Sequence, residues 1–339
     1  MKANTMKANT MEANTMKAIQ VTRSGGPEVL QLIDQPTPTP GPGQILIEVK
    51  AAGINFADLM AREGHYPPAP PPPFVLGVEA AGIVTAVGEG VTNFKSGGRA
   101  AAIISTGGYA EYALADAATA APVPEALGFP EVSALLVQGL TAHGLLSLAV
   151  PEIKGKTVLI SAAAGGVGSL AVQIAKLLGA RTVIGLASTD EKRAKVKELG
   201  ADFAVDYTQE GWAEQVRAIT DGKGADVFLD ASGDNKGGGV KPLARGGYWI
   251  VYGAQSSSET GLSGSDLLSM LFNAQTLRGW SLYGVPTATI AATLKQLIAW
   301  TLSGELTIIA KDKFALADAA EAHRAIETRR TTGKVVLEP

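Results

Sequence analysis

Cysteine is absent from all 339 residues of the chain. Disulfide bonds, thiolate zinc sites and cysteine nucleophiles are therefore excluded. Long basic runs are also lacking and the formal net charge is −3, so the sequence offers no electrostatic footprint for a nucleic-acid partner. The N-terminus shows no positive-then-apolar signal pattern, which predicts a cytoplasmic protein.

A membrane span is not expected, although residues 157–175 carry no charge over a membrane-spanning length. This segment contains three glycines and a glutamine, Gln173, which favour a buried strand, a turn and a helix over a helix in lipid. Apolar residues make up 46% of the chain, which suffices for ordinary globular cores.

The first fifteen residues read MKANT, MKANT and MEANT, and MKAIQ follows. Each copy resembles the start of MKAIQ, and the five-residue period matches no solenoid repeat. The pattern indicates a natural start at Met16, with residues 1–15 an extension outside the fold. A functional arm is the alternative.

The remaining chain changes its pattern twice. Residues 16–137 read as short strands broken by glycine and proline, among them AIQVT, ILIEVK and AAGIVTAVG. Residues 138–303 alternate apolar strands with helical patterns, which predicts an α/β domain with a parallel sheet covered by helices on both faces. Residues 304–339 resume the first pattern, so we expect them to rejoin the first domain.

A glycine turn, SAAAGGVGS, links the strand TVLI to a helix. The strict dinucleotide-binding pattern G-x-G-x-x-G would place glycines at 163, 165 and 168, and only Ala163 departs from it. Gly165 allows close approach to a pyrophosphate, and Gly168 allows close helix–strand packing. The N-terminus of the helix would then bind the phosphates.

The end of the next strand, RTVIGLA, indicates which dinucleotide is bound. NAD sites carry an acidic residue there, whereas this chain carries Ser188, followed by Lys192. A hydroxyl and an ammonium favour the 2′-phosphate of NADPH through charge-assisted hydrogen bonds. Asp190 and Glu191 suit the start of the next helix. The alternative is that Lys192 and Arg193 only form the solvated face of that helix.

Eight segments in one order carry a family resemblance, namely GPEVL, AAGINFAD, REGHYP, GVEAAGIVTAVGEGV, GGYAEY, QGLTAH, AAAGGVG and GKVVLEP. From Met16 to Pro339 the chain resembles the zinc-independent quinone oxidoreductases, or zeta-crystallin group, of the medium-chain dehydrogenase/reductase superfamily. The resemblance implies a GroES-like, mostly-β catalytic domain and a Rossmann domain that binds NADPH.

The resemblance also implies a metal-free site. In zinc-dependent relatives a cysteine ligand falls where Asn55 stands and a histidine ligand where Val78 stands, and neither residue present is a usual zinc ligand. Hydride donation from NADPH to an acceptor that is already electrophilic, such as a quinone or a conjugated enone, would remain.

The family's cofactor residues carry over where the motifs match. Asn55 is expected near the nicotinamide, Thr141 near the ribose or nicotinamide, and Ser188, Lys192 and Tyr207 around the 2′-phosphate. The pyrophosphate turn, the sheet's carboxyl edge and the tail would supply Ala164, Gly165, Gly166, Val167, Gly168, Tyr252, Gly253 and Lys334.

Tyr66 is the best candidate for a catalytic hydroxyl, because it could donate a proton or hydrogen bond to a developing enolate or hydroquinone oxygen. A role as a pocket wall remains open. His65 and His143 are weaker candidates, and His323 is expected at the surface. Glu79 is expected to have a structural role at the domain junction.

Three functions remain open at this point. The first is an NADPH-dependent quinone reductase, and the second a reductase of enone or enoyl double bonds with the same fold and cofactor. The third is a protein that binds NADPH, or RNA, without turnover. Residues 255–285, with the loop SSSETGLSGSD, Trp280 and Tyr283, are expected to shape the pocket. By resemblance a homodimer is expected, with residues 276–283 as its edge strand.

Overall fold

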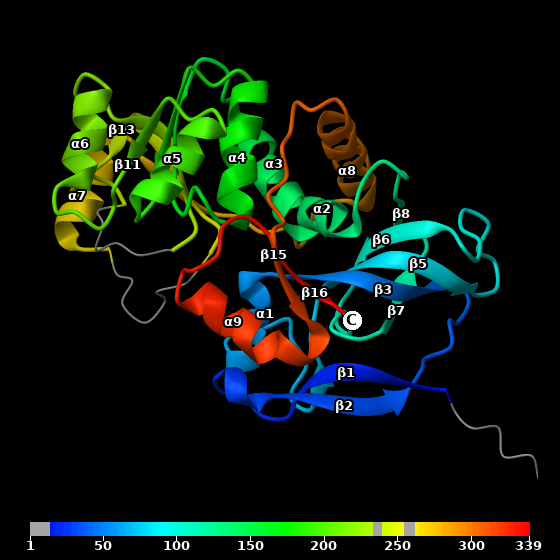
Figure 1. Cartoon of the computed structure of the whole chain (residues 1–339). Coiled ribbons are helices and arrows are strands. Elements are labelled where there is room, and N and C mark those ends of the chain that lie inside the picture. Colours follow the sequence, from blue (N-terminus) through cyan, green and yellow to red (C-terminus); the bar gives the residue numbers. More distant parts are fainter. Residues whose placement is uncertain (1–13, 233–238, 254–261) are drawn as a thin grey trace, which may run out of the picture.

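The computed structural model describes residues 14–232, 239–253 and 262–339. It confirms the α/β class: a mostly-β part holds the start and the end of the chain, and a parallel sheet with helices holds the middle (Figure 1). Most of the repetitive extension and of the loop SSSETGLSGSD lies outside the described residues. Strand β1 begins at Thr15, one residue before Met16.

The first part of the chain is built from short strands and one helix. Its elements are β1 (Thr15–Val21), a 3-10 turn (Pro27–Val29), β2 (Leu30–Pro36), β3 (Gln44–Ile54), α1 (Phe56–Glu63), β4 (Phe74–Val75), β5 (Glu79–Val87), β6 (Arg99–Ile103), β7 (Tyr112–Asp116) and β8 (Ala121–Pro122).

The middle of the chain alternates strands and helices. Its elements are α2 (Phe129–Ala134), a π-helical stretch (Leu135–Gly139), α3 (Leu140–Ser147), β9 (Thr157–Ile160), α4 (Gly166–Leu177), β10 (Thr182–Leu186), α5 (Asp190–Glu198), β11 (Phe203–Val205), α6 (Trp212–Ile219), β12 (Ala225–Asp230), β13 (Leu243–Val251), α7 (Gly264–Asn273), β14 (Thr276–Gly279) and α8 (Thr287–Leu302).

The tail returns to the first part, as its pattern predicted. It forms β15 (Asp312–Ala315), a 3-10 turn (Leu316–Asp318), α9 (Ala319–Glu327) and β16 (Val335–Glu338). Strand β16 pairs antiparallel with the end of β3, so that Val335 lies opposite Ile54. The sheet of the first part thus runs β15-β16-β3-β5-β6-β8, with β7 also paired to β3.

The parallel sheet has the order β11-β10-β9-β12-β13-β14. All four residues of β9 are buried, and alternate side chains enter opposite cores: Val158 and Ile160 pack on one side and Leu159 on the other. A strand buried on both faces needs helices on both sides of its sheet. This explains why Val158, Leu159 and Ile160 form a continuous apolar run in β9, without alternation of apolar and polar residues.

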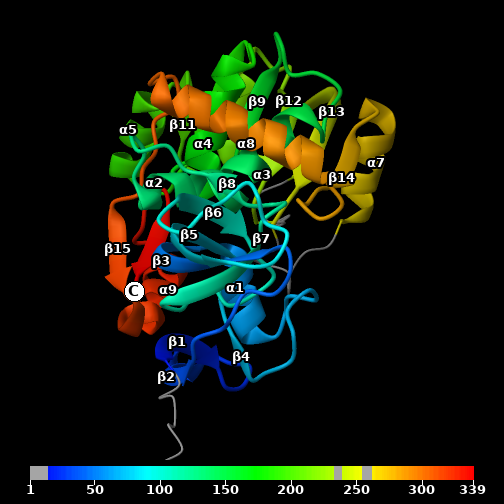
Figure 2. The ribbon, with the colours of Figure 1, turned by 90° about the vertical axis from the view of Figure 1, so that its right-hand side faces the viewer.

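The strand order reverses between β9 and β12, which is the switch point where doubly wound sheets bind ligands. The carboxyl end of β9 lies against the first part of the molecule, because Gly165 forms a parallel bridge with Gly333 of the tail. In Figures 1 and 2 the mostly-β part lies below this sheet. Residues of both parts therefore meet at the predicted coenzyme turn.

Candidate coenzyme and active site

The glycine turn has the close-packed geometry that its sequence predicted. The Gly165 N–H donates to the Ala162 carbonyl at 2.8 Å, and Gly165 caps helix α4. A Cβ on Gly168 would lie 2.2 Å from the Ala162 oxygen, so only glycine fits there. Ala162, rather than Ala163, takes the left-handed conformation, with φ of 46°. The first N–H groups of α4 have no partners within the helix and can receive an anion.

The tail and the π-helical stretch lie on either side of this turn. The Gly333 N–H donates to the Ala164 carbonyl at 2.9 Å. A Cβ on Gly166 would lie 2.2 Å from Oε1 of Gln138, while Gln138 Nε2 donates to the Ile54 carbonyl at 3.3 Å. Gln138 thus connects the coenzyme turn to the end of β3, a role that sequence reasoning missed although it lies in the motif QGLTAH.

Beyond β10 lies a group of residues that we call the basic corner: Ser188, Lys192, Tyr207 and Arg329. The Lys192 ammonium donates to the Arg329 carbonyl at 2.6 Å, and the Arg329 guanidinium donates to the Tyr207 hydroxyl at 2.9 Å. Burial, and then the Arg329 charge, lower the pKa of Lys192. Arg329 thus contacts two of the predicted residues, Lys192 and Tyr207, and no local motif announced it because 137 positions separate it from Lys192. Ser188 follows β10, and its contact with a 2′-phosphate remains a prediction.

Arg193 has a different place from Lys192. Its guanidinium donates to the Ala187 carbonyl at 3.2 Å and pairs with Asp206 at 2.9 Å and with Asp190. Arg193 therefore pairs with two acidic residues and is bound to the loop after β10. It is more than a solvated helix face.

The remaining predicted cofactor residues border the same edge of the sheet. Tyr252 and Gly253 follow β13, and a Cβ on Gly253 would lie 2.1 Å from the Ala231 carbonyl that follows β12. Thr141 is half-buried on α3, and Val167 is half-buried at the start of α4. Their contacts with a coenzyme remain predictions.

Asn55 begins helix α1, and its side chain lies beside a buried ion pair. Its backbone N–H donates to Asp58 Oδ2 at 2.7 Å in a capping box. Nζ of Lys334 donates to Asn55 Oδ1 at 3.1 Å and also pairs with Glu79. The side chains of Lys334 and Glu79 are both completely buried, and Nδ2 of Asn55 has no hydrogen-bond partner among the described residues.

Glu79 does lie at the junction, where it binds more than one element. Its two carboxylate oxygens also accept from the Ser133 hydroxyl at 3.0 Å and from the Val137 N–H at 3.1 Å. The π-helical stretch, which frees backbone groups from the regular pattern, presents the Val137 N–H to it.

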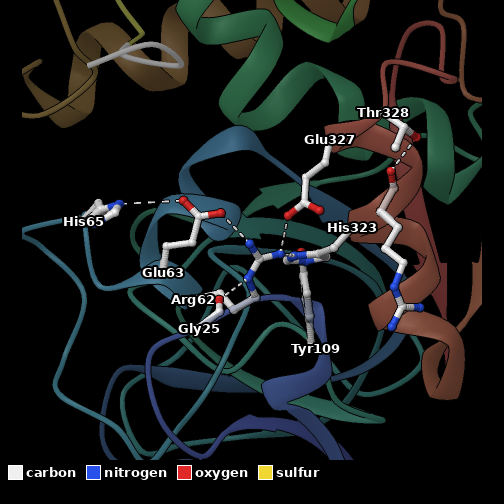
Figure 3. Close-up of polar contacts among 9 residues, drawn as sticks. Gly25, Arg62, Glu63, His65, Tyr109, His323, Glu327 and Thr328 are labelled. Carbon is white, nitrogen blue, oxygen red and sulfur yellow. Dashed lines mark hydrogen bonds and ion pairs between the residues drawn. The ribbon is translucent and has the colours of Figure 1, made fainter. Parts of the chain in front are cut away.

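A second buried polar cluster lies beneath α1, and Figure 3 shows most of it. Arg62, whose side chain is 1% exposed, donates to Nδ1 of His323 at 3.2 Å and pairs with Glu327 at 2.7 Å. Nε2 of His323 lies 3.3 Å from the Tyr109 hydroxyl. The expectation that His323 lies at the surface is wrong, because its side chain is fully buried between α9 and Tyr109.

Burial and the Arg62 charge lower the pKa of His323 to about 3, so this imidazole is neutral and accepts from Arg62. Burial raises the pKa of the nearby Asp58 to about 7, against the lowering effect of its bond to the Asn55 N–H. The Asp58 carboxyl group therefore titrates near neutral pH directly beneath the candidate site.

Two tyrosines from different parts of the chain meet above α1. The Tyr66 hydroxyl lies 2.9 Å from the Tyr283 hydroxyl, and the ring centroids are 6.4 Å apart. Burial, and then the bond to Tyr283, raise the pKa of Tyr66, so its phenol stays protonated. Within this pair one hydroxyl donates to the other, and the second keeps its proton for a ligand.

The two other histidines lie elsewhere. His65 is exposed beside Glu63, with 3.7 Å between Nδ1 and a carboxylate oxygen. His143 contacts the Ser147 hydroxyl at 3.0 Å and the Trp300 ring on the helices, and burial lowers its pKa. Across the described ranges, no three His, Asp or Glu side chains group so as to hold a metal ion. No helix in the described part is long and apolar enough to cross a membrane.

Family models match both parts of the chain. Residues 41–125 match the alcohol dehydrogenase GroES-like domain, and residues 166–302 match the domain described as zinc-binding dehydrogenase. These matches agree with the mostly-β part and the parallel sheet with its glycine turn, and they define a medium-chain dehydrogenase/reductase.

Whole-chain relatives narrow the class. A quinone oxidoreductase of Pseudomonas aeruginosa is 37% identical over 326 residues, which cover 95% of this chain and 99% of the relative. A mycobacterial structure complexed with NADPH has a TM-score of 0.88 at 37% identity and covers 96% of this chain and 100% of its own. The Escherichia coli quinone oxidoreductase complexed with NADPH has a TM-score of 0.88 at 33% identity and covers 95% and 100%. The chain therefore belongs to the quinone oxidoreductase family and is an oxidoreductase.

Proposed function

We propose that the protein is an NADPH-dependent reductase that transfers hydride to quinones. The observation that carries the coenzyme assignment is the basic corner, where Lys192 contacts Arg329, Arg329 contacts the Tyr207 hydroxyl, and Ser188 follows β10. An NAD site would need an acidic residue at this position to bind a ribose hydroxyl. Two cations and two hydroxyls suit a phosphate dianion instead.

The residues present also fit the rest of the coenzyme. The turn from Ala164 to Gly168 offers backbone N–H groups and a helix N-terminus to the pyrophosphate. Among the described residues, the side-chain N–H group of Asn55 is buried and has no hydrogen-bond partner. When bound, NADPH supplies the hydride; the chain itself binds, orients and screens it from water.

The acceptor must be electrophilic without a metal, because asparagine and valine stand at positions 55 and 78. A quinone meets this condition, and two relatives are quinone oxidoreductases. After hydride transfer the reduced oxygen needs a hydrogen-bond donor, and the Tyr66–Tyr283 pair offers one. The same pair suits the enolate oxygen of a conjugated enone, which makes double-bond reduction the second candidate.

The test is coenzyme oxidation followed by absorbance, with NADPH and NADH in parallel. The acceptors would be a small benzoquinone, a polycyclic ortho-quinone, a simple enone and a short enoyl-CoA, each with and without a chelator. We expect fast, chelator-insensitive turnover of NADPH with quinones. Turnover with the enone alone would favour the second candidate, and NADPH binding without any turnover would overturn the proposal.

We also propose that the protein forms a homodimer through the edge of its parallel sheet. Strand β14 is the edge strand, and all four of its residues are exposed. Helix α7 lies beside it (Figure 2) and exposes four large apolar side chains, with 71% of Leu271 and 70% of Phe272 accessible. An exposed apolar surface next to an open edge strand fits pairing with a second copy.

Light scattering of the wild type and of Leu271→Asp with Phe272→Asp tests this assembly. We expect a dimer for the wild type at low micromolar concentration and a monomer for the double variant. A monomeric wild type under these conditions contradicts the dimer proposal and leaves the reductase proposal intact.

A further inference from the structure

Lys334 contacts both Asn55 and Glu79 in a buried cluster beside the coenzyme turn. We propose that Lys334 is a positioning residue, which fixes the Asn55 side-chain amide so that its N–H group faces a carbonyl oxygen of a bound ligand. This inference rests on the proposed function, since the ligand oxygen belongs either to the coenzyme's carboxamide or to the carbonyl acceptor.

The orientation of the amide follows from the chemistry of its neighbour. A lysine ammonium has three donors and no acceptor, so the Asn55 atom that faces it at 3.1 Å must be Oδ1. Nδ2 then points away from Lys334, and it is buried without a hydrogen-bond partner in the part of the chain that the structure describes. With Asp58 holding the Asn55 backbone N–H at 2.7 Å, the residue is fixed at both its main chain and its side chain.

The ammonium is itself held in place. Glu79 pairs with it, and the Ser133 hydroxyl and the Val137 N–H hold the two carboxylate oxygens. A fully buried ion pair contributes little to stability on average, because the loss of hydration offsets the attraction. Its presence here is explained by orientation: it converts a freely rotating amide into a donor of fixed direction.

The neighbouring residues place this donor beside the coenzyme turn. Gly333, next to Lys334, donates its N–H to Ala164 of the turn at 2.9 Å. Ile54, next to Asn55, accepts from Gln138, which also lies against Gly166 at the start of α4. Because the two ends of this contact are both tied to the pyrophosphate turn, a bound coenzyme and its acceptor lie within reach of Asn55 Nδ2.

The test compares Lys334→Gln, Asn55→Ala and the double variant Lys334→Gln/Asn55→Ala. Affinities for NADPH and for 2′,5′-ADP, which lacks the nicotinamide half, are measured by titration calorimetry, and kcat and KM with a benzoquinone are measured alongside. Lys313→Gln is the matched control: it makes the same change in the same tail, where Lys313 pairs with exposed Glu338.

We expect Lys334→Gln and Asn55→Ala to lose about 10-fold in the same quantity, with no further loss in the double variant. A weaker affinity for NADPH with unchanged 2′,5′-ADP binding assigns the oxygen to the nicotinamide carboxamide. Unchanged affinities with a lower kcat/KM for the quinone assign it to the acceptor. Lys313→Gln should match the wild type in every measurement.

Losses that add in the double variant, or a Lys334→Gln enzyme indistinguishable from wild type, overturn the proposal. If Lys334→Gln does not fold, Lys334→Met with Glu79→Gln removes both charges and leaves no unpaired buried ion. That variant should fold and show the same loss, and wild-type behaviour in it would refute the positioning role. If the enzyme turns over no acceptor, the affinities for NADPH and 2′,5′-ADP still show whether Asn55 binds the nicotinamide carboxamide. Failure of the reductase proposal can therefore be told apart from failure of the positioning proposal.

Discussion

Replacing Arg329 should change the choice of coenzyme without changing the chemistry. Its guanidinium lies in the basic corner. Of the four residues that form this corner, Lys192 is the other cation. A hydrogen bond to a charged group contributes about 1.5–3 kcal/mol. Because Arg329 is exposed, the lower end applies, and Arg329→Met should raise the KM for NADPH about 10-fold. The KM for NADH should stay the same.

The neighbouring arginine provides the matched control. Arg330 pairs with Glu321 at 2.8 Å on the opposite side of the tail and contacts none of the basic corner in the described structure. Arg330→Met should leave both KM values unchanged. Equal losses for NADPH and NADH in Arg329→Met, or the same loss in Arg330→Met, would refute the assignment of the 2′-phosphate to this corner.

Salt and pH give a second check on the same corner. The preference for NADPH should shrink at high ionic strength, because exposed charges are screened. The lowered pKa of Lys192 means that its ammonium loses the proton at lower pH than an ordinary lysine. NADPH affinity should therefore fall at the alkaline end of the profile, and Lys192→Met should remove that fall while NADH affinity stays flat.

Three further changes test the core and the candidate site. Asp58 has a pKa of about 7 when folded against 3.8 for the unperturbed group, so its contribution to stability is full below pH 4 and falls by about 4 kcal/mol as the pH rises to 7. The stability difference between the wild type and Asp58→Asn in urea denaturation should follow this change with pH. Gly168→Ala would place a Cβ 2.2 Å from the Ala162 carbonyl and should cost about 1–3 kcal/mol and weaken coenzyme binding in calorimetry. Tyr66→Phe should lower kcat with quinones about 10-fold. Tyr283→Phe should have a smaller effect on kcat, because Tyr66 remains as a donor. Equal kcat values in both variants and the wild type would show that the two tyrosines are only a pocket wall.

Local patterns in the sequence predicted most of the fold. The sequence predicted the strand TVLI, the glycine turn and the following helix, because periodicity and turn chemistry depend on neighbouring residues. The pattern of the tail predicted its return to the first part of the chain, and in the structure β16 pairs antiparallel with β3.

The parts that could not be predicted depend on contacts between distant residues. Glu79 and Lys334 are 255 positions apart, and no sequence spacing links an acid on one strand to a lysine on another. His323 was misplaced because a histidine on a short polar helix usually faces water. The buried alanines beside it, Ala319 and Ala322, were the available signal that this stripe of α9 faces the core.

The tail explains how two ends of one ligand can be sensed by one segment. Arg329 stands at the basic corner, Gly333 donates to the pyrophosphate turn, and Lys334 holds Asn55. Three residues within one six-residue segment thus lie at the proposed adenosine end, the middle and the reacting end of the coenzyme path. Strand β16 anchors the end of this segment in the first part of the molecule, and Gln138 forms a second connection between the turn and the end of β3. The tail segment therefore contacts both parts of the molecule along the edge where the coenzyme is proposed to bind.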